Sequence, residues 1–276
     1  MLKCIFHITV NKIALKKKTV KPLIFLTNDD GFYSEGIAAL SRHLKELGQI
    51  FVVAPDREQS ATSLSLTLHH PLRVKKIKAN TYAVDGTPAD CVYLAVRKLL
   101  PRKPSLLISG INKGPNLGQQ DISYSGTVAG AIQGTFLQIP SVAISLLHDE
   151  TEKFSFDIAA KITYRMVKEL LRKKLPEGVT LNINIPPLPI KGVKIVKLGQ
   201  KRYNPRIIEK KDPRKNIYYW IGTGNPKAKG DKDSDVMVAK KGYITITPLH
   251  TDLTDYKLIK LPLFKNIMAS LKDETF

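Results

Sequence analysis

The sequence predicts an α/β protein: a mostly parallel sheet with helices on both faces, followed by a smaller C-terminal extension with a β-hairpin and a helix. Short apolar runs alternate with segments of helical periodicity through about residue 185, as in sheets whose parallel strands are joined by helices. Runs such as IFVVA (50–54) are apolar throughout, which is typical of strands covered on both faces. After residue 186 the chain becomes rich in Pro, Lys and Gly, and the alternation ends.

The first part of the chain predicts two buried strands, a further strand or hairpin, and two helices. Residues 23–27 form an apolar run, and Ser34 is suited to cap the helix that follows, which Gly48 would end. A strand at 50–54 and a strand or hairpin at 72–84 come next. Thr87 and Asp90, which flank a proline, have the spacing of a helix cap and its third residue. The apolar positions of the first helix are Ile37, Leu40, Leu44 and Leu47.

The second part continues the alternation as far as residue 185. The apolar runs again predict buried strands, and the residues between them have helical spacing. The predicted elements are, in order, a strand at 105–109, a helix from Ser125 to about Gln138, a strand at 141–146, a helix carrying Ile158, Ile162, Met166 and Leu170, and a strand at 180–185.

Three regions follow from these patterns. We expect residues 1–20, which mix apolar and basic residues, to form a disordered N-terminal arm and not an export signal, because its lysines follow its apolar stretch. Residues 21–186 form the core. Residues 187–276 form the extension, with short strand-like pieces at 193–198, 217–221 and 243–247 and a helix within 252–272. We expect the extension to make contacts between subunits.

The composition limits the classes of partner and compartment. Lys and Arg number 44 and Asp and Glu 24, giving a net charge of +20. A basic surface attracts nucleotides, nucleic acid or acidic lipid, although a lysine-rich composition explains the charge equally well. No stretch approaches the roughly 20 apolar residues that span a membrane. Two cysteines fit a reducing compartment, so we expect a cytoplasmic protein.

Two adjacent acids, Asp29 and Asp30, follow the first strand directly. Two ionised carboxylates about 4 Å apart repel by roughly 4 kcal/mol at a partly screened dielectric, so the fold must offset their charge. A shared proton, a nearby base such as Arg57 or Lys113, or a divalent cation would each do so. The structural alternative is that the acids cap a turn or the following helix, since Asp before Gly is common in turns.

Polar segments after other predicted strands favour the cation. Ligands of open parallel sheets lie beyond the carboxyl ends of the strands. Ser60 and Asn112 follow neighbouring strands and could add a hydroxyl and an amide oxygen to the two acids. Oxygen ligands alone suit a hard ion such as Mg²⁺ or Mn²⁺.

The segment YSGT (124–127) stands at a predicted helix start. Backbone N–H groups, two hydroxyls and the positive end of a helix dipole make such a segment suited to bind phosphate. The alternative is an ordinary serine cap. The sequence lacks a G-x-S-x-G elbow, a Walker A loop and an H-E-x-x-H motif. A hard cation beside a phosphate-binding segment therefore suggests hydrolysis of a phosphate ester.

Several segments in order resemble the SurE family, the survival-protein 5′/3′-nucleotidases. The early motifs carry most of the resemblance, and the match extends from residue 23 to about residue 255. The segments are TNDDGFYSEGI (27–37), VVAPDREQSATSLSLTL (52–68), VDGTPADCVYLA (84–95), SGINKGPNLG (109–118), YSGTVAGA (124–131), NINIPPLP (182–189) and GYITITPLHTDLT (242–254).

The resemblance implies a metal-dependent phosphatase that releases phosphate from nucleoside monophosphates. It implies a Rossmann-like core, one divalent cation (Mg²⁺ or Mn²⁺) and a homodimer or homotetramer that exchanges C-terminal elements. One departure is that Gln119 and Gln120 stand where many relatives carry acids. The implied metal ligands are Asp29, Asp30, Ser60 and Asn112, of which Asp29 or Asp30 acts on the attacking water, and the implied phosphate contacts are Asn116, Ser125, Gly126 and Thr127.

A second hypothesis belongs to another class: a basic nucleotide- or RNA-binding module without turnover, whose paired acids are structural. It explains the charge directly and leaves nucleic acid open as a partner. It does not explain why short polar segments gather at the ends of predicted strands.

Overall fold

The computed structural model describes residues 21–148, 155–173, 175–222, 224, 227–229 and 231–271. The expected N-terminal arm at 1–20 lies outside the described residues.

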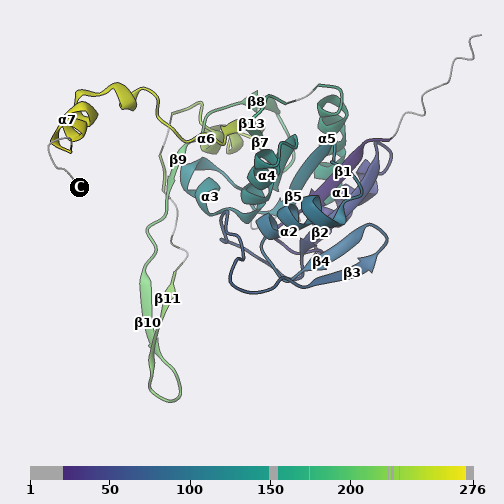
Figure 1. Cartoon of the computed structure of the whole chain (residues 1–276), viewed down its shortest axis with the longest axis horizontal. Helices are drawn as coiled ribbons and strands as arrows, with labels where there is room; N and C mark the ends of the chain where they lie inside the picture. Colours follow the sequence, from purple (N-terminus) through teal and green to yellow (C-terminus); the bar gives the residue numbers. More distant parts are fainter. Residues whose placement is uncertain are drawn as a thin grey trace, which may run out of the picture.

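A sheet of nine strands, counted over these residues, forms the centre of the molecule (Figure 1). Its order is β3-β4-β2-β1-β5-β6-β7-β13-β8, and every neighbouring pair from β4 to β7 is parallel. With helices on both faces, this sheet confirms the predicted fold class. The strands are β1 (Leu23–Thr27), β2 (Gln49–Pro55), β3 (Val74–Lys78), β4 (Thr81–Val84), β5 (Leu106–Lys113), β6 (Ser141–Leu146), β7 (Val179–Ile185), β8 (Gly192–Ile195) and β13 (Tyr243–His250).

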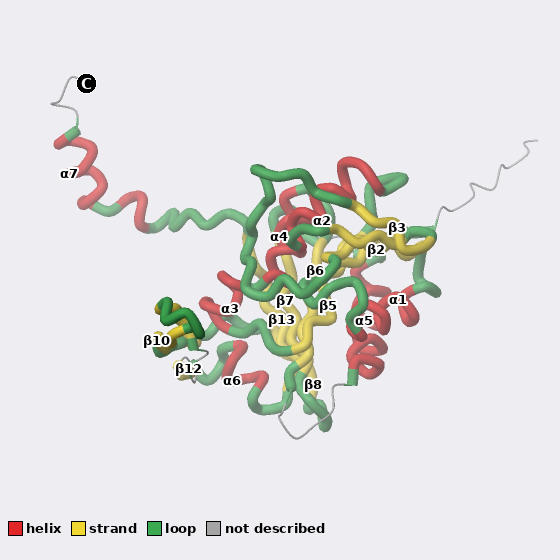
Figure 2. Tube along the Cα trace, turned by 90° about the horizontal axis from the view of Figure 1, so that it is seen from below, coloured by secondary structure: helices red, strands yellow, loops and turns green. Residues whose placement is uncertain are grey.

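Helices cover the two faces of the sheet in pairs (Figure 2). Helices α1 (Glu35–Leu44) and α5 (Phe156–Leu170) pack together on one face, and α2 (Pro88–Leu94) and α4 (Gly126–Phe136) pack together on the other. The predicted caps are present: Ser34 accepts from the N–H of Ile37, and Thr87 and Asp90 form a reciprocal capping box. Three further helical elements are short: the π-helix η1 (Ala95–Leu99), α3 (Gly118–Tyr124) and α6 (Asp235–Ala239).

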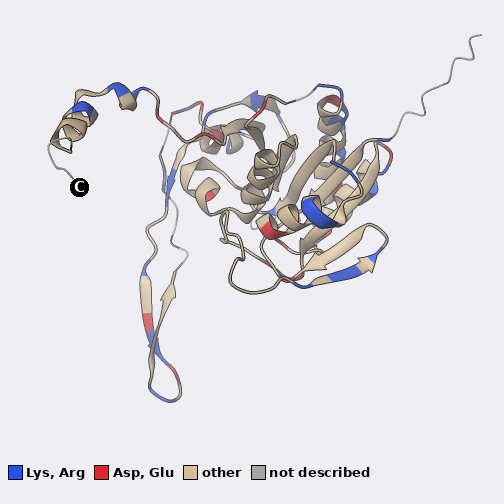
Figure 3. Ribbon diagram, in the orientation of Figure 1, with Lys and Arg blue, Asp and Glu red and all other residues tan. Residues whose placement is uncertain are grey.

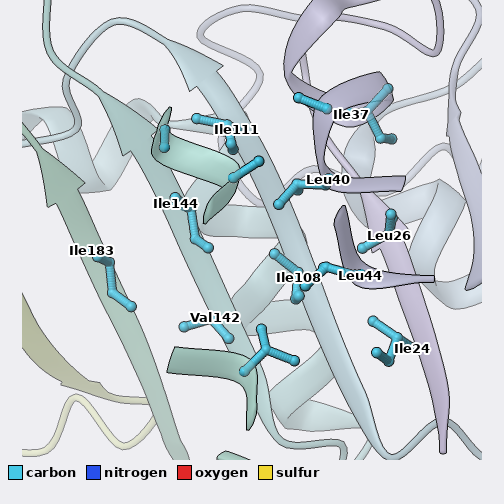
Figure 4. Packing of buried hydrophobic residues seen from close by; sticks show 14 of the residues in the cluster. Ile24, Leu26, Ile37, Leu40, Leu44, Ile108, Ile111, Val142, Ile144 and Ile183 are labelled. Atoms are coloured by element: carbon cyan, nitrogen blue, oxygen red, sulfur yellow. The ribbon is translucent and has the colours of Figure 1, made fainter. Parts of the chain in front are cut away.

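Two separate apolar layers explain why β1 is apolar at nearly every position. Ile24 and Leu26 belong to the layer under α1 and α5, whereas Leu23 and Phe25 belong to the layer under α2. Successive side chains of a strand point to opposite faces, so a strand covered on both sides has no polar face. Figure 4 shows the first layer, in which Ile37, Leu40 and Leu44 of α1 lie over side chains of the sheet.

Helix α4 lies very close to the sheet because glycine recurs at every fourth position. A Cβ atom at Gly130 would come within 2.9 Å of Ser109 Oγ, and one at Gly134 within 2.4 Å of Ser141 Oγ. Positions four apart share one face of a helix. The glycines therefore form a stripe without side chains, along which α4 approaches the strands and its N-terminus reaches the end of β1.

The C-terminal region is only partly the separate extension that the sequence predicted. Strand β13 returns to the main sheet, where it pairs antiparallel with β7 and parallel with β8. The rest projects from the body: the hairpin of β10 (Ile207–Lys211) and β11 (Ile217–Ile221), and helix α7 (Pro262–Ser270), stand clear of the core (Figure 1). Smaller elements are β9 (Gln200–Arg202), β12 (Lys227–Lys229) and the 3-10 helix η2 (Leu258–Lys260). Over the described residues, no helix is long and apolar enough to cross a membrane.

The glycine stripe yields a stability prediction. Gly134→Ala should lower the free energy of unfolding by about 1–3 kcal/mol. The added methyl group overpacks a tight contact, and this cost exceeds the stabilisation from the higher helix propensity of alanine. Ser141 cannot easily yield, since its hydroxyl donates to the carbonyl of Ile139 at 2.8 Å. Phe136→Ala is the control on the same helix: its ring is 53% exposed, so its effect should stay within about 0.5 kcal/mol. Urea titration followed by circular dichroism measures both, and a stabilised Gly134→Ala protein would contradict the close approach.

Candidate functional site

The candidate site lies at the carboxyl ends of β1 and β5, where the strand order of the sheet reverses. From β1 the chain moves outward to β2 and β4 on one side, and later returns to β5 on the other side of β1. Crevices form at such switch points because the connections leave in opposite directions. The segments after β1 and at the end of β5 both face this crevice.

The turn after β1 is held by Asn28. The two acids are therefore not needed to cap this turn, which was the structural alternative for them. The amide of Asn28 is buried and donates to the carbonyl of Gly31 at 2.9 Å and to Ser34 Oγ at 2.7 Å. Gly31 adopts a φ of 92°, which a residue with a side chain rarely adopts. Asn28 therefore links the turn to the cap of α1, and the side chains of Asp29 and Asp30 have other partners.

Asp29 is buried against the N-terminus of α4. Its Oδ1 accepts a hydrogen bond of 2.5 Å from Thr127 Oγ1, and 6% of the residue is exposed. Burial raises the pKa of Asp29 from 3.8 to about 6, with the charge of Asp30 adding to the effect and the Thr127 bond opposing it. The fold thus holds this carboxyl in a place where its ionised form is unfavourable unless a positive charge joins it.

Asp30 is more accessible than its neighbour. Its Oδ2 accepts from the backbone N–H of Lys113 at 3.1 Å, which ties the turn after β1 to the end of β5. Burial is the main cause that raises the pKa of Asp30, and the charge of Glu58 adds to it. The charge of Lys113 lowers this pKa, but it is the smallest contribution.

Ser60 lies in the loop after β2 and Asn112 near the end of β5, and these two strands flank β1. Ser60 Oγ donates to Glu58 Oε1 at 2.6 Å, so the lone pairs of the hydroxyl remain for another partner. Strand β5 was expected to end at residue 109 but continues to Lys113, with an irregularity between Ser109 and Asn112. The amide nitrogen of Asn112 donates to the carbonyl of Gly114 at 2.9 Å, which leaves its oxygen as the atom suited to a cation.

Asn116 is fixed by buried amides of β7. Its N–H donates to Asn184 Oδ1 at 2.9 Å, and its carbonyl accepts from the amides of Asn182 and Asn184. Its own amide donates to Ser145 Oγ at 2.7 Å. These bonds explain the two asparagines of this largely apolar strand: they hold the loop that carries Asn116.

The segment 125–127 begins α4, as the sequence predicted. Ser125 is the N-cap, and its Oγ accepts from the N–H of Val128 at 3.0 Å. A Cβ atom at Gly126 would lie 2.8 Å from Asp29 Cβ, so close packing against the acid already requires glycine here. The hydroxyl of Thr127 is engaged by Asp29. The assignment of these three residues as phosphate contacts stays a prediction.

A pocket of about 880 Å³ brings most of the candidate residues together. Six of the eight line it, and Gly126 and Thr127 stand behind Asp29. Of the remaining lining residues, sequence reasoning had named only Lys113, as a possible counter-charge, and Gln120, as a departure from the family. Those that follow residue 200 belong to the C-terminal region, where no motif indicated them. The lining consists of Asp29, Asp30, Glu58, Ser60, Ala61, Asn112, Lys113, Pro115, Asn116, Gln120, Asp121, Tyr124, Ser125, Tyr203, Pro205, Ile221 and Gly222.

The donor set fits a hard divalent cation such as Mg²⁺ or Mn²⁺ better than a softer metal that prefers His or Cys. Over the described residues, no group of three or more His, Cys, Asp and Glu side chains could hold a metal. Two carboxylates with a hydroxyl and an amide oxygen form an oxygen-only set, and Mg²⁺ commonly binds through one or two carboxylates while keeping several waters. Burial is the main cause that raises the pKa of both acids, and a cation bound beside them would favour their ionised forms.

Comparison with known proteins gives consistent matches. A family model described as Survival protein SurE matches residues 24–205. A protein of Geotalea daltonii named 5′-nucleotidase SurE is 45% identical over 239 residues, covering 86% of this chain and 96% of that protein. One from Aquifex aeolicus with the same name is 45% identical over 244 residues, covering 87% and 96%. The crystal structure of the SurE protein from Aquifex aeolicus matches with a TM-score of 0.76 and 43% identity, covering 89% of this chain and 100% of that one.

The burial of Asp29 predicts how stability depends on pH in the presence of a chelator. A carboxyl whose pKa is raised on folding contributes stability that is present below pH 3.8 and lost as the pH rises through about 6. Since the two pKa values differ by about two units, Asp29→Asn should be more stable than the original chain at pH 7 by roughly 3 kcal/mol.

Urea titrations at pH 4 and pH 7 measure this difference. Asp233→Asn, at an exposed acid, is the control and should keep the original pH dependence. An Asp29→Asn protein no more stable than the original at pH 7 would show that burial of Asp29 carries no such cost.

Proposed function

Since the chain belongs to the survival protein SurE family and is a 5′-nucleotidase, we propose that it hydrolyses nucleoside monophosphates to nucleoside and phosphate with the aid of a divalent cation. The family match confirms the resemblance drawn from the motifs. One observation carries the proposal: the two acids after β1, the end of β5 and the N-terminus of α4 open into the same pocket. A pocket of about 880 Å³ is within the range that small-molecule sites occupy.

Asp29, Asp30, Ser60 and Asn112 would hold one Mg²⁺ or Mn²⁺. A bound divalent cation neutralises phosphoryl oxygens and lowers the pKa of a bound water. This proposal is supported by the oxygen-only donor set and by the raised pKa of both acids. The expected cytoplasmic location stays a prediction.

The chain's own groups would perform the remaining steps. Asp30 is more exposed than Asp29, so we propose that Asp30 accepts the proton of the attacking water. Thr127 holds the orientation of Asp29. Ser125 and the first N–H groups of α4 would bind the phosphoryl oxygens, where the helix dipole favours negative charge. Asn116 is held by β7 and would add a fixed contact.

We also propose that the chain forms a homodimer or homotetramer through its C-terminal elements. Both faces of the β10–β11 hairpin carry exposed apolar side chains, including Ile208 and Trp220, which pair across one face, and Ile207 and Ile221, which pair across the other. Helix α7 exposes Leu263, Phe264, Ile267 and Met268. A two-stranded hairpin with two apolar faces is marginal in water and needs cover.

The distribution of charge does not single out a nucleic-acid surface. Figure 3 shows Lys and Arg on separate parts of the molecule, among them strand β3 and the tip of the hairpin. The tip carries Lys210, Lys211, Arg214 and Lys215 close to exposed tyrosines, a combination that favours a nucleic-acid-binding module. Chelator-insensitive nucleotide binding with no turnover would support that reading.

Removal of the cation should stop phosphate release. With AMP as substrate, excess EDTA should abolish activity, and excess Mg²⁺ or Mn²⁺ should restore it, because the two acids lose their counter-charge. Asp30→Asn should lower kcat by about 100-fold or more, the typical contribution of a positioned base. Release of phosphate is measured colorimetrically, with Asp233→Asn as control. Full activity of the chelated protein, or of Asp30→Asn with an intact circular dichroism spectrum, would refute the mechanism.

A charge on the apolar hairpin should weaken association. Trp220→Glu should lower the mass measured by size-exclusion chromatography with light scattering, because it would bury a carboxylate in an apolar contact. Lys210→Gln, on the facing strand, is the control and should leave the mass unchanged. If the original chain were monomeric, or if Trp220→Glu left the mass unchanged, the proposal that the hairpin forms the interface would be refuted.

A further inference from the structure

We propose that residues after 199 complete the active pocket, and that Tyr124 and Tyr203 form a slot that binds the nucleobase of the substrate. The inference rests on the proposed function and adds to it the part of the pocket that recognises the nucleoside. It concerns the hairpin stalk, which we define as residues 199–206 and 221–222, between the core and the β10–β11 hairpin.

The pocket has lining of two chemical kinds. The ends of β1 and β5 contribute acids and amides, whereas Tyr124, Tyr203, Pro205 and Ile221 contribute apolar or aromatic surface. Tyr124 is 55% exposed and Ile221 75% exposed, so the side chains offer area that a ligand could cover. A phosphate ion needs no such surface. A nucleobase does, because its flat faces stack on aromatic rings and its edges stay polar.

A buried ion pair fixes the stalk against the core. Lys201 Nζ lies 2.6 Å from Asp121 Oδ2, with their side chains only 14% and 7% exposed. Asp121 also accepts from the N–H of Leu117 at 3.2 Å. The same carboxylate therefore joins Lys201 of the stalk to the N-terminal end of α3. The Lys201 ammonium lies 5.1 Å from the centre of the Tyr203 ring, so the same pair also sets the place of that ring.

Backbone contacts extend this attachment. The N–H of Gln119 donates to the carbonyl of Gly199 at 2.9 Å, and the N–H of Tyr203 donates to Gln120 Oε1 at 3.1 Å. The buried carboxylate of Asp235 accepts from the N–H groups of both Gly118 and Gly199, at 2.7 and 2.6 Å. Helix α3 and the stalk are therefore joined as one piece, with Tyr124 at the end of α3 and Tyr203 on the stalk.

Chain connectivity places the slot next to the phosphate end. Tyr124 directly precedes Ser125, the cap of α4, and its carbonyl accepts from the N–H of Ser63 at 3.1 Å. A ring at this position is one residue from the proposed phosphate contacts. A nucleotide carries its base a ribose away from its phosphate, so one pocket with a phosphate end and an adjoining aromatic wall suits it.

The competing occupant is a second copy of the chain. The exposed apolar side chains of the hairpin need cover, and Ile221 belongs both to the hairpin and to the pocket. If a second copy covered Tyr124 and Tyr203, substitutions there would change association and not the response to the base. The test therefore measures both.

The test compares AMP with ribose 5-phosphate, which carries the same ester and sugar without a base. Tyr124→Ala and Tyr203→Ala should each lower the ratio of kcat/KM for AMP over ribose 5-phosphate by about tenfold, the scale of one lost base–aromatic stack. Tyr124→Phe keeps the ring and should restore the ratio. Tyr219→Ala is the matched control. Tyr219 lies in β11 and is 60% exposed but does not line the pocket, so the ratio should stay at the original value.

Adenosine binding separates this inference from the proposed function. Calorimetric titration with adenosine in the presence of EDTA requires neither a cation nor turnover, and Tyr124→Ala should raise its Kd by about tenfold. If the original chain were inactive but still bound adenosine through Tyr124, the proposed hydrolysis would be refuted and the nucleobase slot would be supported. An active chain whose ratio and adenosine Kd are unchanged in both alanine variants would overturn the slot. Loss of mass by light scattering with an unchanged ratio would assign the tyrosines to a subunit contact instead.

Discussion

The close approach of helix α4 to the end of β1 is the contact on which the candidate site depends. A side chain at Gly126 would collide with Asp29, and the next residue, Thr127, donates its hydroxyl to that acid. The approach is possible because Gly130 and Gly134 continue the same bare face along the strands. This one packing feature therefore sets the position of the Asp29 carboxyl and of the helix N-terminus beside it. A phosphate ester bound here would lie close to both the acid and the positive end of the helix dipole.

This arrangement costs stability in order to place charge. The burial that orients Asp29 also raises its pKa, and the pKa of Asp30 is raised beside it. A fold selected only for stability would replace such a pair by neutral groups, since a buried carboxyl without a counter-charge is unfavourable. The hydrogen bonds that Asn28 makes within the turn show that the turn itself does not require either acid. What the acids supply is a concentrated negative field at the floor of a pocket, and that field suits a divalent cation.

Local patterns predicted most of the core, and non-local pairings account for what they missed. Ser34, Thr87 and Ser125 act as caps where the sequence indicated, because a cap depends on residues three apart. The extension of β5 to Lys113 and the return of β13 to the sheet were missed, because both depend on strands far away in the chain. The partners of Asp29 and Asp121 were missed for the same reason: Thr127 and Lys201 lie 98 and 80 residues away. The two asparagines within β7 were an available signal, because their side chains bond the loop at Asn116.

The hairpin stalk lies between the pocket and the hairpin that we expect to make subunit contacts. Tyr203 and Pro205 of the stalk line the pocket together with the acids of the core. The stalk is held to α3 by the Lys201–Asp121 pair and by Asp235, within the same chain. Contacts between subunits would engage the hairpin beyond the stalk and helix α7, where the exposed apolar side chains lie. Association through the hairpin would therefore reach the pocket by way of this stalk, which a buried ion pair and backbone hydrogen bonds hold against the core.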